Sequence, residues 1–379
     1  MRVAFVSNVI YPFVTGGAEK RIHEIATRLT ERGHEVTIYG RYYWDGPKET
    51  THEGITLRAV SPERDLYTGD GGRRSITEAL EFSKDVVRPL RRNIDDHDVV
   101  VASVFPYFPV LAAEIATFRT GTPLVTTWHE VWGDYWHDYL GNLAPFGKLT
   151  EHLTARVPQY AIAVSGITAD RLATIGPSRD RIEIVPNGID YERIRTTDPA
   201  SDGFDVLFAG RLIPDKRVDV LLDAFDRAAP PNTTLGIIGD GPARESLEAH
   251  AEILDTSDQI TFLGFLEEYN DVLAHMRVAD VFASPSTREG FGITYAEAMA
   301  AGCVVIGADH PDSAADEVIG DAGFVSDPTV EALATILDRV LNGYRPTANP
   351  AEHARKYDWD TVTEQAQAAY RAAIDDTIG

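Results

Sequence analysis

The sequence predicts an α/β protein built from two doubly wound domains, each with a parallel sheet covered by helices on both faces. Its length of 379 residues suits two domains of ordinary size. Short apolar runs alternate with amphipathic segments, as in parallel sheets connected by helices. This alternation stops at a polar segment rich in turn formers, residues 196–204, and then restarts.

The first domain is expected to span residues 1–195. Its apolar runs predict strands at 3–9, 35–40, 98–103, 123–129, 160–165 and 182–188. A helix at 18–32 follows the first strand. Residues 196–204 are the expected linker.

The second domain is expected to span residues 205–356. Its apolar runs predict strands at 205–210, 235–241, 260–265, 281–286 and 303–308. A final helix, 357–379, has apolar positions spaced for packing on another surface. Ligands of doubly wound sheets bind beyond the carboxyl ends of the strands, so two facing domains predict a site in the crevice between them.

The charge of the chain limits its partners. The sequence has 59 acidic and 35 basic residues, a formal net charge of -24. This charge repels nucleic-acid backbones and anionic membrane surfaces, so nucleic acid is excluded as a partner. The acidic composition resembles that of proteins from very salty cytoplasm.

The sequence indicates a cytoplasmic protein. Cys303 is the single cysteine and stands in an apolar run, where a buried small side chain is expected. The start, MRVAFVSNVI, is typical of a buried strand and not of a signal peptide. The uncharged stretch 99–113 is too short to span a membrane. Any membrane contact is therefore expected to be peripheral, at the inner face.

Three loops have residues suited to binding an anion or a sugar. In the first, Gly16 and Gly17 follow the first strand and precede a helix, whose amino-terminal amides favour negative charge. A plain tight turn is the alternative. The G-x-G-x-x-G fingerprint of dinucleotide-binding enzymes is absent, which argues against a nicotinamide enzyme.

The second loop follows the first strand of the second domain and contains Arg211 and Lys216. A guanidinium can bind two phosphate oxygens, and an ammonium adds a point charge. A solvated surface pair is the alternative.

The third loop, STREGFGITYAEAMAAG, contains Glu289 and Glu297. If a helix begins near Gly292, its amides can face a diphosphate while the two carboxylates accept hydrogen bonds from sugar or ribose hydroxyls. Helix-capping and surface glutamates are the alternative.

These segments together resemble the retaining glycosyltransferases of family GT4, which have the GT-B fold of two Rossmann-like domains. The resemblance covers nearly the whole chain. It includes GGAEKRIHEIATRLTERGHEVTIYG, AIAVSGITADRL, IVPNGID, AGRLIPDKRVDVLLDAF, IIGDGPARESL, FLGFL and SPSTREGFGITYAEAMAAGCVVIGA.

The resemblance implies a role for each matching position. Gly17, next to Gly16, would lie near the donor, and His129 would reach its sugar. Arg211 and Lys216 would neutralise the departing diphosphate. Glu289 would bind sugar hydroxyls, and Glu297 would bind the ribose. Phe265 and Leu266 would lie beside the base. The backbone amides that would contact the sugar and phosphates are those of Gly290, Phe291, Gly292 and Ile293. The catalytic set is then His129, Arg211, Lys216 and Glu289.

The loop 309–316 departs from the family pattern, which leaves its phosphate contacts open. No metal or other cofactor is expected, because fixed cations and amides can stabilise the leaving diphosphate. The triplets Asp96-His97-Asp98 and Asp358-Trp359-Asp360 are interpreted as structural.

An acceptor surface is predicted in the first domain. Trp128, Trp132 and Trp136 are four residues apart, which places them on one helical face with Tyr135 nearby. A core and an acceptor groove fit this pattern equally well, and Trp132, Tyr135 and Trp136 are the acceptor candidates. The cluster Arg88, Arg91 and Arg92 would suit a lipid phosphate, with a solvated helix face as the alternative.

The sequence therefore predicts a metal-independent, retaining hexosyltransferase. Its donor would be a UDP- or GDP-sugar. Its acceptor would be a saccharide or a polyprenyl-phosphate-linked molecule, in surface glycan synthesis. The alternatives are a nucleotide-sugar epimerase of the same architecture and a non-catalytic sugar-nucleotide-binding protein.

Overall fold

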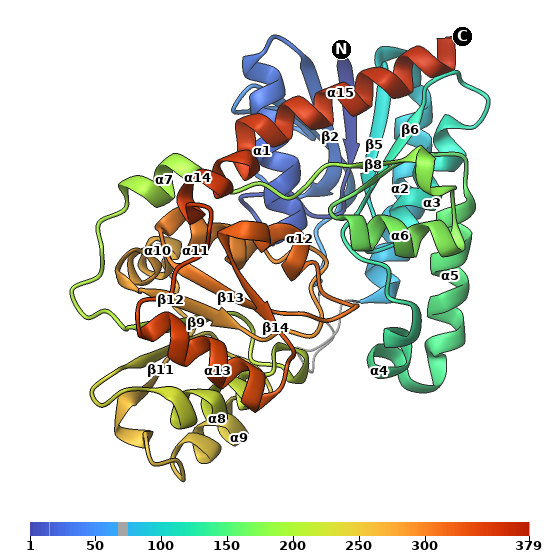
Figure 1. The fold of residues 1–379 in the computed structure, drawn as a ribbon. Helices are drawn as coiled ribbons and strands as arrows, with labels where there is room; N and C mark the ends of the chain where they lie inside the picture. The colour runs from blue at the N-terminus through green and yellow to red at the C-terminus, as the bar shows by residue number, and fades with distance from the viewer. Residues whose placement is uncertain (15, 67–74, 379) are drawn as a thin grey trace. The chain divides into compact units, whose positions relative to one another are not determined.

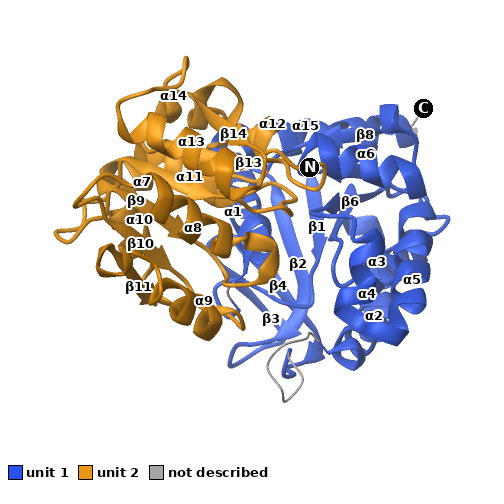
Figure 2. Ribbon diagram, turned by 60° about the horizontal axis from the view of Figure 1, so that its bottom comes forward, with its two compact units in different colours: residues 1–186, 360–379 blue, residues 187–359 orange. Residues whose placement is uncertain are grey.

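A computed structural model describes residues 1–14, 16–66 and 75–378 (Figure 1). The chain divides into two compact units (Figure 2). Unit 1 contains residues 1–186 and 360–379, and unit 2 contains residues 187–359. Each unit is an α/β structure around its own sheet, so the predicted fold class is confirmed.

The sheet of unit 1 has the strand order β3-β4-β2-β1-β5-β6-β7-β8. Its strands are β1 (Arg2–Val6), β2 (Glu35–Tyr42), β3 (Glu49–His52), β4 (Ile55–Pro62), β5 (Val99–Ser103), β6 (Leu124–Trp128), β7 (Tyr160–Ala163) and β8 (Ile182–Ile184). Neighbouring strands are parallel except β3, which pairs antiparallel with β4. Strands β3 and β4, which extend the sheet at one edge, were not predicted from the sequence.

Helices cover this sheet on both faces. They are α1 (Gly17–Glu31), α2 (Ile76–Arg92), α3 (Phe108–Thr117), α4 (Trp136–Leu140), α5 (Ala144–Arg156), α6 (Gly166–Ile175) and α15 (Trp359–Ile378). Helix α15 packs on the first strands although it comes last in the chain. The Tyr370 ring meets Phe5 of β1 edge to face at 6.3 Å between centroids, and Arg28 of α1 pairs with Asp360 at 2.9 Å.

The sheet of unit 2 is parallel, with the strand order β11-β10-β9-β12-β13-β14. Its strands are β9 (Val206–Ala209), β10 (Leu235–Ile238), β11 (Ile260–Gly264), β12 (Val281–Ser284), β13 (Val304–Ala308) and β14 (Gly323–Ser326). Its helices are α7 (Tyr191–Thr196), α8 (Val218–Ala228), α9 (Arg244–Ala251), α10 (Tyr269–Val278), α11 (Ile293–Ala301), α12 (Ala315–Ile319), α13 (Val330–Leu341) and α14 (Pro350–Ala354). Strand β9 is central, as expected for the first strand of a doubly wound unit.

The division between the units differs from the predicted linker. The predicted linker, 196–204, lies inside unit 2, because this segment bonds to helices of that unit. Arg277 donates to the carbonyl of Thr197 at 3.4 Å, and the amide of Ala200 donates to the carbonyl of Ala274 at 3.0 Å. The turn formers in residues 196–204 therefore indicate a loop of unit 2 and not a linker between the units. The chain passes from unit 1 to unit 2 after residue 186.

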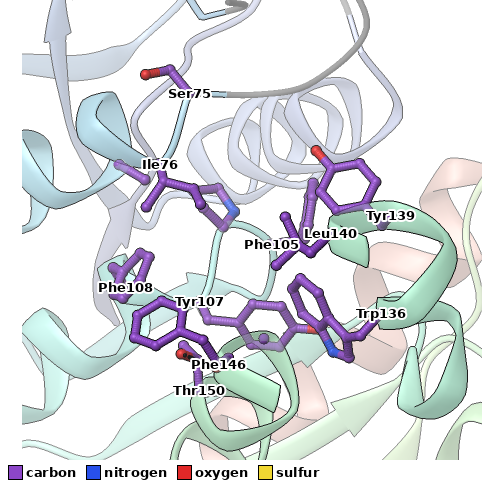
Figure 3. A pocket seen from close by; sticks show the side chains of 13 residues that line it. Ser75, Ile76, Phe105, Tyr107, Phe108, Trp136, Tyr139, Leu140, Phe146 and Thr150 are labelled. Carbon is purple, nitrogen blue, oxygen red and sulfur yellow. Dashed lines mark hydrogen bonds between the residues drawn. The ribbon is translucent and has the colours of Figure 1, made fainter. Parts of the chain in front are cut away.

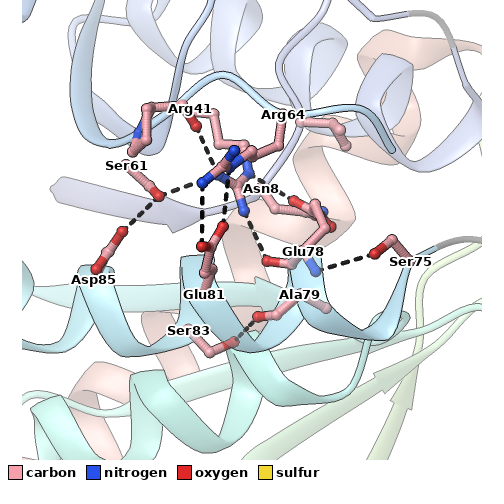
Figure 4. Close-up of polar contacts among 12 residues, drawn as sticks. Asn8, Arg41, Ser61, Arg64, Ser75, Glu78, Ala79, Glu81, Ser83 and Asp85 are labelled. Atoms are coloured by element: carbon pink, nitrogen blue, oxygen red, sulfur yellow. Dashed lines mark hydrogen bonds and ion pairs between the residues drawn. The ribbon is translucent and has the colours of Figure 1, made fainter. Parts of the chain in front are cut away.

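A buried ion pair fixes the start of α2 in unit 1 (Figure 4). Arg41 of β2 is fully buried and donates to Glu78 of α2 at 2.6 Å. Asn8, just after β1, also donates to the Glu78 carboxylate, and Arg41 reaches Ser61 of β4 at 3.1 Å. These bonds hold α2 against β2 and the loop after β1, and they satisfy the buried charges, which must be paired and hydrogen-bonded.

Within residues 1–14, 16–66 and 75–378, no helix combines the length and the apolar composition needed to cross a membrane.

Candidate active site

The predicted donor residues of unit 2 gather at the carboxyl edge of its sheet. Arg211 follows β9, Phe265 follows β11, and Glu289 lies between β12 and α11. Because β9 and β12 are neighbours, the loops that follow them lie side by side. This is the edge at which doubly wound sheets bind their ligands.

Glycines allow the loops at this edge to pack backbone against backbone. A Cβ added at Gly239, where φ is +134°, would lie 1.9 Å from the carbonyl oxygen of Gly210. One added at Gly241 would lie 2.3 Å from the carbonyl oxygen of Leu212. The loops after β9 and β10 are therefore in direct contact, and only glycine fits at these positions. The IIGDG motif belongs to the family resemblance, but the sequence did not indicate this packing role.

Lys216 and Glu289 form an ion pair between these loops. Lys216 ends a short 3₁₀ turn, Pro214–Lys216, and its Nζ donates to Oε1 of Glu289. The neighbouring backbone also joins the loops, because the amide of Thr287 donates to the carbonyl of Asp215 at 2.9 Å. The two residues were assigned to different parts of the donor, and the structure brings them together.

The loop 309–316 positions Glu289. The Glu289 amide donates to the carbonyl of Asp312 at 3.1 Å, and the Ala314 amide donates to the carbonyl of Glu289 at 2.9 Å. This loop, which departs from the family pattern, thus has a structural role whether or not it contacts phosphate.

Helix α11 begins where the third loop predicts a helix. Gly292 has φ +83° directly before the helix, and a Cβ there would lie 2.4 Å from the Tyr295 ring. The Tyr295 hydroxyl donates to the carbonyl of Ser284 at the end of β12, at 2.9 Å. The first-turn amides of α11, including that of Ile293, lie at the carboxyl edge, where a helix amino terminus favours an anion.

Gly290 and Phe291 complete the loop before α11. The Phe291 side chain is buried and packs edge to face on Tyr357 at 5.2 Å between centroids. Its side chain therefore belongs to the core, and only its backbone is suited to the predicted ligand contact.

Glu297 lies in the second turn of α11 and is buried. The Tyr269 hydroxyl of α10 donates to Oε1 of Glu297. Burial, and then the adjacent carboxylate, raise the pKa of Tyr269, which keeps this phenol protonated as a donor. Tyr269 belongs to no recognised motif, and only the packing of α10 against α11 reveals it.

Three predicted donor residues are accessible at this edge. Arg211 is exposed, and Leu266 is half-buried. The Phe265 side chain is 72% exposed, which is unusual for a phenylalanine. An exposed ring directly after β11 is suited to covering a nucleotide base.

In unit 1, Gly16 and Gly17 stand at the start of α1, as predicted. The Gly16 backbone is extended, and a Cβ there would lie 2.3 Å from Oε2 of Glu19. Glu19 is itself buried beneath this turn. Thr15, the residue before the glycine pair, lies outside the described residues.

His129 directly follows β6 and is bonded to the neighbouring strand. Its Nε2 lies 3.0 Å from the Ser103 hydroxyl at the end of β5. Burial, and then the nearby Arg21, lower the pKa of His129 to about 3, so its imidazole is neutral near pH 7. Arg21 donates to the carbonyls of Val185 and Pro186.

The three tryptophans do not share one helix, so this prediction is wrong. Trp128 ends β6, where it pairs in register with Ala163 of β7 and is fully buried. Trp132 lies in the loop that follows, and Trp136 begins α4. The spacing of four reflects a strand, a loop and a short helix in succession.

A buried carboxylate organises the remaining aromatic candidates. Glu151 of α5 accepts hydrogen bonds from the Tyr107 hydroxyl at 2.8 Å and from the Trp132 amide at 2.7 Å. The Trp136 indole also donates to it, at 3.3 Å. The Tyr135 ring packs edge to face on Trp132. These rings form a cluster around one fixed anion, which the sequence spacing did not indicate.

The arginine cluster lies away from these candidates. Helix α2 has 17 residues, or about 25 Å at 1.5 Å per residue, and Arg88, Arg91 and Arg92 lie in its last turns. The carboxyl end of α2 leads to the start of β5, at the amino edge of the sheet, whereas the aromatic candidates follow the carboxyl end of β6. Arg91 also donates to the carbonyl of Ala116 at 2.9 Å. The helix direction thus separates these arginines from the aromatic cluster.

The described residues contain no group of three His, Cys, Asp or Glu side chains arranged to hold a metal ion. In the triplet before β5, Asp98 instead pairs with Arg2 at 2.7 Å.

Comparison with known proteins adds the family. Residues 15–193 match the model of Glycosyltransferase Family 4, and residues 191–357 match that of Glycosyl transferases group 1. The chain is 30% identical to phosphatidyl-myo-inositol mannosyltransferase of Mycolicibacterium smegmatis, over 98% of this chain and 93% of that protein. It is 27% identical to glycogen synthase of Mycobacterium tuberculosis, over 98% of this chain and 95% of that protein.

The fold is also found in solved structures. The Anabaena protein HepE, solved with UDP and glucose, superposes with a TM-score of 0.72 at 20% identity, over 98% of this chain and all of that one. The chain belongs to the group 1, family 4 glycosyltransferases with the GT-B fold, enzymes that transfer a sugar from a nucleotide-sugar.

Proposed function

We propose that this enzyme is a retaining, metal-independent hexosyltransferase that uses a UDP- or GDP-sugar. Its acceptor is a saccharide or a lipid-linked molecule of a surface glycan, reached in the cytoplasm or at the inner face of the membrane. The observation that carries the proposal is the Lys216–Glu289 ion pair at the carboxyl edge of unit 2, beside the amino terminus of α11.

In this proposal, Lys216 and Arg211 stabilise the diphosphate. When the bond from the anomeric carbon to the phosphate oxygen breaks, its electron pair stays on the diphosphate while positive charge grows on the sugar. Fixed cations next to the departing oxygens act on charge that is largest in the transition state. The α11 amides add donors from the same side, so a metal ion is not required.

Glu289 and Glu297 bind opposite ends of the donor. Glu289 accepts hydrogen bonds from sugar hydroxyls, and its pairing with Lys216 places it beside the diphosphate. Glu297 accepts from the ribose hydroxyls, and Tyr269, which donates to Oε1 of Glu297, holds this carboxylate in place. In the retaining reaction the acceptor oxygen bonds to the anomeric carbon on the face that the diphosphate leaves, and a phosphate oxygen takes the acceptor's proton.

The proposal is tested with a panel of UDP-, GDP- and ADP-sugars, with nucleotide release as the measurement. We expect release from a UDP- or GDP-sugar, a rate that rises with added acceptor, and the same rate after chelation of divalent metal. Release restored only by Mg²⁺ or Mn²⁺ would contradict metal independence. Conversion of the donor sugar without nucleotide release would instead indicate an epimerase.

A further inference from the structure

Unit 1 contains a second hollow at the edge of its sheet that the proposed chemistry does not use. We define the amino-edge pocket as the hollow of about 340 Å³, partly open to solvent, that is lined chiefly by Glu114, Phe118, Arg119, Leu124, Tyr160 and Thr377. Leu124 and Tyr160 are the first residues of β6 and β7, so the pocket lies at the amino edge of the sheet. Doubly wound sheets bind the ligands of their reaction at the other edge, beyond the carboxyl ends of the strands.

The volume of the amino-edge pocket is in the range of small-molecule sites. The opposite end of α3 offers much less room. Figure 3 shows Tyr107 and Phe108, at the start of α3, with Trp136 and Phe146 around a hollow of about 50 Å³. That space suits a few water molecules. The amino-edge pocket, by contrast, is large enough for a small organic ligand.

Two opposite charges line the amino-edge pocket without pairing. Glu114, in the last turns of α3, is half-buried, and within the described part of the chain its carboxylate has no hydrogen bond or ion pair. Burial raises the pKa of Glu114. Arg119 is exposed, and its guanidinium lies over the Phe118 ring, 5.0 Å from the ring centroid. A half-buried carboxylate and a nearby cation that leave each other unpaired can each bind a ligand group.

The backbone at Arg119 is unusual for a long side chain. Its φ is +58°, in the left-handed region where a helix more often ends on glycine. A non-glycine residue in this region is strained, and such strain is concentrated at ligand-binding and other functional positions. Here the strained residue is the one that brings a positive charge to the wall of the pocket.

The other walls of the amino-edge pocket add little polar recognition. The Tyr160 hydroxyl already donates to Asp376 of α15, and the Thr117 hydroxyl donates to the carbonyl of Ala113 at 3.1 Å. The Phe118 side chain is 55% exposed and presents an apolar ring. The carboxyl end of α3 favours positive charge and so strengthens the attraction of Glu114 for a cation.

We infer that the amino-edge pocket binds a small zwitterion of the class of an α-amino acid with an apolar side chain. The ammonium of the ligand pairs with Glu114, its carboxylate pairs with Arg119, and its apolar group lies against Phe118. A simple anion would meet the Glu114 carboxylate, and a simple cation would meet Arg119. A molecule with both charges satisfies both side chains through charged hydrogen bonds. This site is separate from the proposed sugar transfer and does not depend on it.

The test uses three probes with the same ring, which are phenylalanine, phenylpropionate and phenylethylamine. Phenylpropionate lacks the ammonium, and phenylethylamine lacks the carboxylate. Binding to the full chain is measured by calorimetric titration near neutral pH. We expect phenylalanine to bind at least tenfold more tightly than either of the other two, because it alone makes both charged contacts.

The variants Glu114→Gln and Arg119→Gly each remove one charge. Glutamine keeps the shape of Glu114, and glycine is favoured in the left-handed backbone of Arg119, so the fold is preserved. We expect each to weaken phenylalanine binding at least tenfold. Glu114→Gln should also bind phenylpropionate more tightly than the parent does, because the repelling carboxylate is gone. The matched control is Arg339→Gln in unit 2, since Arg339 is also an exposed cation over a ring, that of Tyr344.

Three results would overturn the inference. The first is a parent protein that does not bind phenylalanine, or binds it no more tightly than the singly charged probes. The second is an equal loss of phenylalanine binding in Arg339→Gln, which would show that the overall charge of the chain decides binding. The third is a loss of phenylpropionate binding in Glu114→Gln, which would give this carboxylate a structural role in place of ammonium recognition.

Discussion

Lys216 and Glu289 lie in loops that follow two different strands, β9 and β12, and the Lys216 ammonium donates directly to the Glu289 carboxylate. Both side chains are only partly exposed, 20% and 12% respectively. Each therefore fixes the other in place before the donor binds. In the proposed function, the cation assigned to the diphosphate and the carboxylate assigned to the sugar therefore form one group.

We expect Lys216→Ala and Arg211→Ala each to slow sugar transfer by roughly a hundredfold or more, because both cations act on charge that grows in the transition state. Steady-state nucleotide release measures the effect. Arg227→Ala is the control, since Arg227 is an exposed cation of α8 that pairs with Glu331. Activity within threefold of the parent in the Lys216 variant would remove this residue from the diphosphate site.

Glu289→Gln is expected to depress turnover while affinity for free UDP or GDP barely changes, because its carboxylate positions the sugar and not the nucleotide. The ion pair adds a second expectation. Combined with Lys216→Ala, the substitution should cost less than the product of the two single effects, since residues in contact are not additive. Independent effects in a double-mutant cycle would argue against a shared role.

Glu297→Gln should weaken free nucleoside diphosphate binding by about 1 to 3 kcal/mol, through loss of charged hydrogen bonds to the ribose. Calorimetric titration with UDP and GDP measures this change. Glu289→Gln is the comparison, because it should leave this affinity unchanged. The same loss in both variants, or none in either, would mean that one carboxylate is misassigned.

The stability of the protein should fall as the pH is lowered from about 6.5, the ordinary pKa of histidine. Burial holds the pKa of His129 near 3, so the unfolded chain binds this proton first as the pH falls. In His129→Gln, the slope of unfolding free energy against pH between 6.5 and 4.5 should be smaller by up to about 1.4 kcal/mol per pH unit. His97, whose pKa is lowered to about 4, is present in both the parent and the variant and contributes to the pH dependence of stability in both. Parallel denaturant titrations with identical slopes would show that His129 is not held neutral.

Arg41→Met should lower the free energy of unfolding by about 3 to 5 kcal/mol, because it leaves the Glu78 carboxylate buried without its cation. Urea unfolding measures the loss. The double variant Arg41→Met with Glu78→Gln should be more stable than the single one, since no unpaired charge remains. A single variant as stable as the parent would contradict the burial of this pair.

The sheet cores were predictable because a strand such as β1 contains a continuous apolar run, Val3 to Val6, that is fully buried. The edge strand β3 was not predictable, since its sequence ETTH has no apolar residue to mark a strand. The predicted linker at 196–204 and the predicted helix shared by the three tryptophans were wrong for a related reason. Turn formers and a spacing of four are local signals, whereas the bonds of Ala200 and the register of Trp128 depend on distant segments.

For the site, motif order indicated which loops carry polar residues, and parallel-sheet topology placed them at one edge. The sequence did not indicate that Lys216 bonds to Glu289. This bond requires β9 and β12 to be neighbours in the sheet, and two other strands lie between them in the chain. Tyr269 and Glu151 have no sequence signal at all. Their hydrogen-bond partners are set by the packing of helices, so only the structure reveals their roles.

The placement of α15 has a consequence for synthesis on the ribosome. Unit 2 is one continuous segment, whereas unit 1 needs residues 360–378, which pack on β1 through Tyr370 and on α1 through Asp360. Domains generally fold during translation in the order in which they emerge. Here the first unit to begin is the last to be completed, because its final helix leaves the ribosome only after all of unit 2. Until then the apolar surface around Phe5 lacks its cover, and exposed surface of this kind makes a partly folded chain prone to aggregation.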